Sequence, residues 1–125
     1  MTTEVGTQKR QLIAGADLTG LEYKVVTLDG VICSAALFNR AAGILAHGNV
    51  ASAHISVAYA GLGKAYMGLG CASVGWPLKI ANSGWLTPCG SGDYSVARLS
   101  DATAASGDLA QVTFDFRQAA GYIGI

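Results

Sequence analysis

The chain has 125 residues, enough for one domain with its own hydrophobic core and too few for two full-sized domains. Its eight Lys and Arg residues balance eight Asp and Glu residues, and Lys9-Arg10 is the only basic pair, so we expect no nucleic acid partner. The apolar runs are too short to span a membrane or to form the core of a signal peptide, so we expect neither membrane insertion nor export.

The cysteines indicate where the chain is made. Cys33, Cys71 and Cys89 are odd in number and widely spaced, which argues against a disulfide framework and for a reducing compartment. We therefore expect synthesis in a cytoplasm.

The N-terminal residues are polar, lack periodicity and precede the first apolar cluster. They predict an extended arm over residues 1–14, followed by a single β domain over residues 15–125. The arm residues expected to bind a partner are Thr3, Glu4, Val5, Gln8, Lys9 and Arg10.

The pattern after the arm is typical of a mainly β protein, with short apolar runs separated by Gly, Asn, Asp or Pro. Residues 23–28 and 31–33 predict a hairpin, because the intervening Asp29-Gly30 favours the positive φ angles of a tight turn. Ile55, Val57 and Tyr59 alternate as on a half-buried strand. Residues 109–116 predict another such strand, with Val112, Phe114 and Phe116 on one face.

Residues of the first half recur in the same order in the second. The matched residues are Gly15, Gly20, Lys24 and Val25 with Gly70, Gly75, Lys79 and Ile80, then Gly30 with Gly84, and Leu45, Ser52 and Ile55 with Leu99, Ser106 and Leu109. This order predicts a duplicated unit, with chance matching of a Gly- and Ala-rich chain as the alternative. Because one half cannot cover its own apolar face, residues 15–69 and 70–125 are expected to form one compact β-barrel or sandwich with approximate internal two-fold symmetry.

Motifs for catalysis, metals or cofactors are absent from the sequence. His47 and His54 lack the spacing of a metal pair, and the run from Gly61 to Ala65 lacks the required residues of a phosphate-binding loop. Ser91 lies outside a nucleophile elbow. We expect no enzyme activity, no metal and no cofactor, although a Cys–His couple stays an alternative because catalytic partners need not be close in sequence.

Aromatic and apolar residues in the second half are candidates for an oligomer interface. Trp76 and Trp85 each follow a glycine and flank turn residues, with core packing as the alternative role. Tyr122 and Ile123 lie in an apolar C-terminal end that either joins an interface or folds back on its own sheet.

The order of several segments resembles a known family. After the polar arm come Gly15-Ala-Asp-Leu18, Leu21-Glu-Tyr-Lys-Val-Val-Thr-Leu-Asp-Gly30, Ala41-Ala-Gly-Ile-Leu45, Gly63-Lys-Ala-Tyr-Met-Gly68 and Ser106-Gly-Asp-Leu-Ala-Gln-Val112. From about Gly15 to Phe116 this order is similar to that of the capsid cement, or head decoration, proteins of tailed bacteriophages. The resemblance implies a virion protein on the outer capsid surface that bridges subunits of the major capsid protein, usually as a homotrimer.

The mechanism expected from this resemblance is strand addition. The arm from Thr3 to Arg10 would pair with an exposed capsid edge, and many weak contacts would act together over the shell. The rival readings are a ligand- or glycan-binding β-barrel for host adhesion, using Trp76, Trp85 and Tyr94, and a cysteine-dependent enzyme using Cys33 or Cys89 with a histidine.

Overall fold

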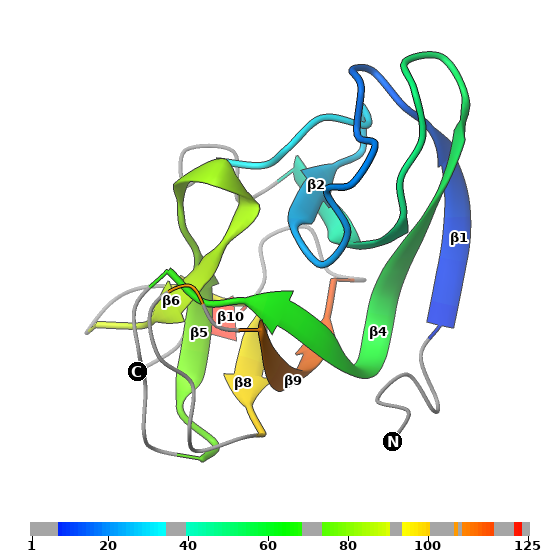
Figure 1. Ribbon diagram of the computed structural model, residues 1–125. Helices are drawn as coiled ribbons and strands as arrows, with labels where there is room; N and C mark the ends of the chain where they lie inside the picture. The colour runs from blue at the N-terminus through cyan, green and yellow to red at the C-terminus, as the bar shows by residue number, and fades with distance from the viewer. Residues whose placement is uncertain are drawn as a thin grey trace.

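The computed structural model describes residues 8–34, 40–68, 74–90, 94–100, 107, 109–116 and 122–123. The fold is mainly β, as the sequence predicts, with a curved sheet that nearly closes into a barrel (Figure 1). The elements are β1 (Gln8–Ile13), β2 (Val25–Thr27), β3 (Ala41–His47), β4 (His54–Tyr66), β5 (Pro77–Ile80), the 3₁₀ helix η2 (Asn82–Gly84), β6 (Leu86–Pro88), β7 (Tyr94–Ser95), β8 (Ala97–Leu99), β9 (Leu109–Asp115) and β10 (Tyr122–Ile123).

The strand order of the main sheet repeats itself about its middle. The order is β2-β3-β4-β9-β8-β5-β6, β1 pairs with β4 outside this path, and β10 pairs separately with β7. Moving outward from the antiparallel β4–β9 pair, β3 and β2 on one side take the places of β8 and β5 on the other. The two halves of the chain are therefore related by an approximate two-fold rotation.

The pairing registers support this relation. Equivalent cross-strand pairs are Ile44–Ala58 and Leu45–Val57 in the first half, and Arg98–Thr113 and Leu99–Val112 in the second. The expected match of Leu45 with Leu99 is therefore confirmed. The expected match of Ile55 with Leu109 is wrong by one residue, because Val57 is equivalent to Val112 and Ile55 therefore to Ala110.

The matches around β2 and β5 differ from those expected. The N–H of Cys33 donates to the carbonyl of Val25, and the N–H of Cys89 donates to that of Pro77, each at 2.9 Å. Val25 is thus equivalent to Pro77, and not to Ile80 as the sequence alignment placed it. The reason is the longer connection in the second half, where η2 separates β5 from β6.

The predicted turn at Asp29-Gly30 is confirmed. Gly30 has a φ of 76° and donates to the carbonyl of Thr27 at 3.0 Å. The N–H of Thr27 then donates to the carbonyl of Val31 at 2.8 Å, which closes the hairpin.

The predicted alternation is also confirmed in the long strands. In β9, Val112 and Phe114 are buried while Thr113 is exposed. In β4, Ile55 and Val57 are buried and Tyr59 is half-buried.

The expected arm differs from the structure in its second part. Residues 8–13 form β1, which runs antiparallel to β4 with Arg10 opposite Val57 and Ile13 opposite His54. Most side chains of β1 are exposed, so backbone hydrogen bonding at a sheet edge places this strand rather than side-chain burial. That is why hydrophobic periodicity did not reveal it.

The core is divided between two clusters. The larger combines both halves, including Ile44 and Ala58 from the first and Leu99 and Val112 from the second. The smaller belongs to the first half alone, where residues such as Leu18 cover Leu45 and Val57. The sheet of the first half is therefore buried on both faces, between the segment that follows β1 and the second half.

Candidate functional site

The N-terminal residues expected to bind a partner lie partly in β1. Gln8, Lys9 and Arg10 begin this strand, whereas Thr3, Glu4 and Val5 are outside the described residues. The guanidinium of Arg10 lies over the ring of Tyr59, 5.2 Å from its centroid. It also donates through Nη2 to the carbonyl of Ala42 at 3.5 Å. Arg10 therefore ties β1 to the sheet.

The outer edge of β1 pairs with no other strand in the part of the chain that the structure describes. At the end of β1, Ala14 donates to Ala53 at 2.9 Å and accepts from Ser52 at 2.8 Å, so its backbone groups face the β4 side. Because these groups alternate along a strand, the N–H of Gln11 points away from β4. The exposed residue Gln11 thus offers a backbone donor for an incoming strand.

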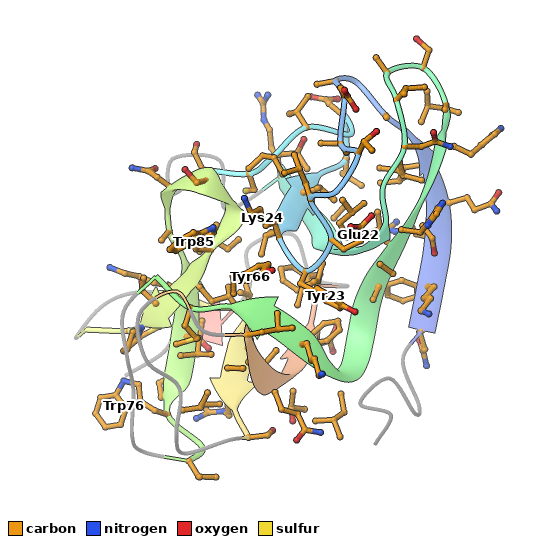
Figure 2. All side chains as sticks on the ribbon, in the orientation of Figure 1. Glu22, Tyr23, Lys24, Tyr66, Trp76 and Trp85 are labelled. Carbon is orange, nitrogen blue, oxygen red and sulfur yellow. The ribbon has the colours of Figure 1, made fainter. Side chains whose placement is uncertain are left out.

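The structure does not bring the two tryptophans together. Trp76 precedes the first residue of β5, and Trp85 precedes Leu86, which pairs with the last residue of β5. They therefore lie at opposite ends of the β5–β6 hairpin (Figure 2). Trp76 is 39% exposed beside Val74, which is 62% exposed, and its indole nitrogen donates to the carbonyl of Cys89 at 3.2 Å.

Tyr122 and Ile123, the other two residues predicted at an interface, lie in a short strand. Tyr122 and Ile123 form β10, which pairs with Ser95 and Tyr94 of β7. β10 thus pairs with a strand of its own chain. The side chains of Tyr94, Tyr122 and Ile123 are outside the described parts.

An aromatic face lies where the two halves meet, formed by Tyr23, Tyr66 and Trp85 with Glu22 and Lys24 beside them. These residues come from the segment before β2, the end of β4 and the start of β6, and all are half-buried. The rings of Tyr66 and Trp85 stack with centroids 6.3 Å apart and planes 28° apart. Figure 2 shows the three aromatic residues in a row across the molecule.

Tyr23 has an unusual backbone conformation. Its φ is 71°, a region that bulky side chains rarely adopt. The N–H of Tyr23 donates to the carbonyl of Leu45, and the N–H of Leu45 donates to that of Lys24, both at 2.8 Å. This is a G1-type β-bulge, whose first residue is normally glycine. In the second half the equivalent residue is Gly75, with a φ of 84° and the same bond to Leu99.

Glu22 and Lys24, the charged residues of the aromatic face, each lie against a glycine. One carboxylate oxygen of Glu22 accepts from the N–H of Gly48 at 2.9 Å. A Cβ atom on Gly84 would lie 3.1 Å from the Cβ of Lys24, so the stem of Lys24 packs against the backbone next to Trp85. Sequence reasoning missed Glu22, Tyr23, Lys24 and Tyr66, because only long-range pairing brings them to Trp85.

Of the chemical candidates in the sequence, Cys33, Cys89, His47 and His54 lie in the described residues, whereas Cys71 and Ser91 lie outside them. Burial raises the pKa of Cys33 to about 11, the opposite of what a thiolate nucleophile requires. His47 and His54 are exposed. Within the described ranges, no group of three His, Cys, Asp or Glu residues could hold a metal ion, and no helix is long and apolar enough to cross a membrane.

Comparison with known proteins gives a similarity of fold. No family model matches the chain, and no curated protein matches it. Among solved structures, the chain is similar to the head fiber gp8.5 N base of bacteriophage phi29, with a TM-score of 0.62 and 11% sequence identity. The match covers 86% of this chain and 93% of that chain. This chain therefore has the fold of that phage protein.

Proposed function

We propose that this protein binds the outer surface of an assembled bacteriophage head and serves there as a decoration, or cement, protein. The observation that carries the proposal is the similarity, over 86% of the chain, to the N base of a phage head fiber. The sequence resemblance to capsid cement proteins supports the same role. Because one fold serves many functions, the surfaces of the molecule must supply the mechanism.

The proposed contact with the major capsid protein is the outer edge of β1. A sheet edge offers unused N–H and C=O groups, and an extended segment of a partner can add to it as a further strand. The outward N–H of Gln11 and the exposed side chains of β1 fit this mode of binding. Residues 8–13 then act as an edge of the folded body, in place of the extended arm that the sequence predicted.

The proposed assembly is a homotrimer in which Trp76 and Val74 meet a neighbouring copy. They are the exposed large hydrophobic residues closest to β5, with 39% and 62% of their surface accessible. A trimer would present several copies of the β1 edge to the shell, so that individually weak contacts add up. The role needs neither catalysis nor a cofactor.

The test is sedimentation of the protein with empty heads of the phage whose genome encodes it. The informative variant is Gln11→Pro, which removes the outward N–H without a loss of bonds to β4. Gln11→Ala is the matched control, because it removes the side chain and keeps the N–H. We expect the wild type and Gln11→Ala to sediment with heads and Gln11→Pro to stay in solution.

The outcomes separate the role from the mechanism. Equal sedimentation of all three forms would support head binding and exclude strand addition at β1. If the wild type stays in solution with heads that lack it, the decoration role is wrong. Light scattering of the free protein tests the trimer, and Trp76→Ser should lower its mass to that of a monomer.

A further inference from the structure

Two features of the aromatic face carry an energetic cost, and the first is the backbone conformation of Tyr23. A non-glycine residue in the left-handed region costs on the order of 1–2 kcal/mol. Tyr23 adopts this region, whereas its equivalent in the second half is Gly75, which adopts it without strain. The bulge therefore needs no side chain at this position. What Tyr23 adds is an aromatic ring.

The strained conformation is held firmly. Besides the two bonds with Leu45, the carbonyl of Tyr23 accepts from the N–H of Tyr66 at 3.2 Å. Strain persists in proteins where surrounding contacts determine the backbone, and such places cluster at functional sites. The same contacts set Tyr23 beside Tyr66, and Tyr66 stacks on Trp85.

A second cost lies at the other end of the aromatic face. The indole N–H of Trp85 is buried and has no hydrogen-bond partner within the described residues. A buried donor without an acceptor costs roughly 1–3 kcal/mol. The ring itself lies against Gly68, where an added Cβ would come within 3.5 Å of the indole. Trp85 is thus placed by packing and stacking, not by a polar partner in the protein.

We propose that the aromatic face is a binding site for a neutral sugar. One side of a pyranose ring presents C–H groups that pack on the π faces of Tyr and Trp, and its hydroxyls bond to nearby polar side chains. Tyr23, Tyr66 and Trp85 supply the rings. Glu22 supplies acceptors and Lys24 supplies donors.

The chemistry of the aromatic face favours a sugar over a peptide strand or an anion. A peptide strand needs free backbone groups, but those of Tyr23 and the carbonyl of Lys24 are used by Leu45 and Tyr66. An anion needs excess positive charge, but Lys24 is offset by Glu22. The site goes beyond the proposed capsid role and would let a head-bound protein also contact a glycan-bearing surface.

The test is saturation-transfer NMR of the full-length protein with methyl glycosides of glucose, galactose and N-acetylglucosamine. We expect transfer to the ring protons of at least one sugar, with loss of the signal in Tyr23→Gly and Trp85→Leu. Arg98→Ala is the control, because it removes an exposed side chain of β8 that is not part of the aromatic face, and it should keep the signal. Absence of transfer to all three sugars, or full transfer in Tyr23→Gly, would overturn the proposal.

Two further measurements distinguish a binding role of Tyr23 from a structural role. Tyr23→Gly should lower the unfolding temperature only slightly, because relief of the positive φ offsets the lost packing of a half-buried ring. A clearly lower unfolding temperature would make Tyr23 a structural residue and contradict the proposal. Binding should also be insensitive to salt, whereas a signal that disappears at high ionic strength would indicate an anionic ligand instead.

Discussion

The two halves of the molecule share a strand register but not a pattern of burial. Ile44 and Ala58 are 3% and 4% exposed, whereas the equivalent residues Arg98 and Thr113 are exposed. The neighbouring pairs, Leu45–Val57 and Leu99–Val112, are buried in both halves. At these positions the sheet of the first half is therefore buried on both faces, whereas the sheet of the second half is exposed on one face. The backbone pairing determines which residues lie opposite each other. The segments that pack on the sheet determine which of its faces are buried.

The largest predicted difference between the halves comes from truncating equivalent residues. Ile44→Ala leaves a cavity between the halves and should lower the free energy of unfolding by about 2–4 kcal/mol. Arg98→Ala removes an exposed side chain whose guanidinium donates to the carbonyl of Gly75 at 3.0 Å. Its effect should stay below about 1 kcal/mol. Urea unfolding measures both free energies. Equal losses of stability in the two variants would contradict the difference in burial between the halves.

A second comparison uses glycines with the same backbone conformation. Gly30 and Gly75 have φ values of 76° and 84°. A Cβ on Gly30 would overlap the carbonyl oxygen of Ile13, whereas nothing lies within 4 Å of one on Gly75. Gly75→Ala should therefore cost about 1 kcal/mol from φ strain alone. Gly30→Ala should cost about 3 kcal/mol or more, because the backbone must also move. Similar unfolding temperatures of the two variants would contradict this.

A smaller effect is predicted where β1 attaches to the first half. Arg10→Ala removes the contact with the Tyr59 ring and should weaken the attachment of β1 by about 0.5–1 kcal/mol. Hydrogen exchange should accelerate for the β1 amides that face β4, while amides of β8 and β9 keep their protection. Arg98→Ala is the matched control. Unchanged exchange in β1 would mean that Arg10 does not hold the strand.

A last prediction concerns the dependence of stability on pH, through the buried Cys33 of the first half. Burial raises the pKa of Cys33 to about 11, so the folded state keeps this proton in a pH range where the unfolded chain, with a thiol pKa of about 8.5, loses it. The unfolded state binds fewer protons there, and stability should fall as the pH rises from about 8.5 to 11. Chemical unfolding at pH 8 and pH 10.5 should show a smaller drop for Cys33→Ala than for the wild type. An identical drop would contradict the assigned cause.

The sequence predicts the parts of the fold that depend on neighbouring residues. The turn at Gly30 and the alternation in β9 follow from local conformational preference and from one buried face. The duplication could be recognised because Leu45 and Leu99 occupy equivalent places in the sheet. The match failed at Val25, because the second copy carries η2 and the gap could not be placed from glycines alone.

The candidate sites were predictable only in part. β1 lacks a periodic pattern because its side chains are mostly exposed. It is a strand because its backbone pairs with the edge of β4. Trp85 was predicted as an interface residue, with core packing as the alternative, but its neighbours Tyr23 and Tyr66 are distant in sequence. A tyrosine with a positive φ also follows no local rule, because strand propensity would place it in an extended conformation.

The most direct test of the proposed function is electron cryomicroscopy of heads assembled without this protein, imaged before and after it is added. We expect new density on the outer surface, with the fold of the present chain and with β1 as the element nearest to a strand of the capsid protein. Heads that look the same before and after addition would contradict the decoration role.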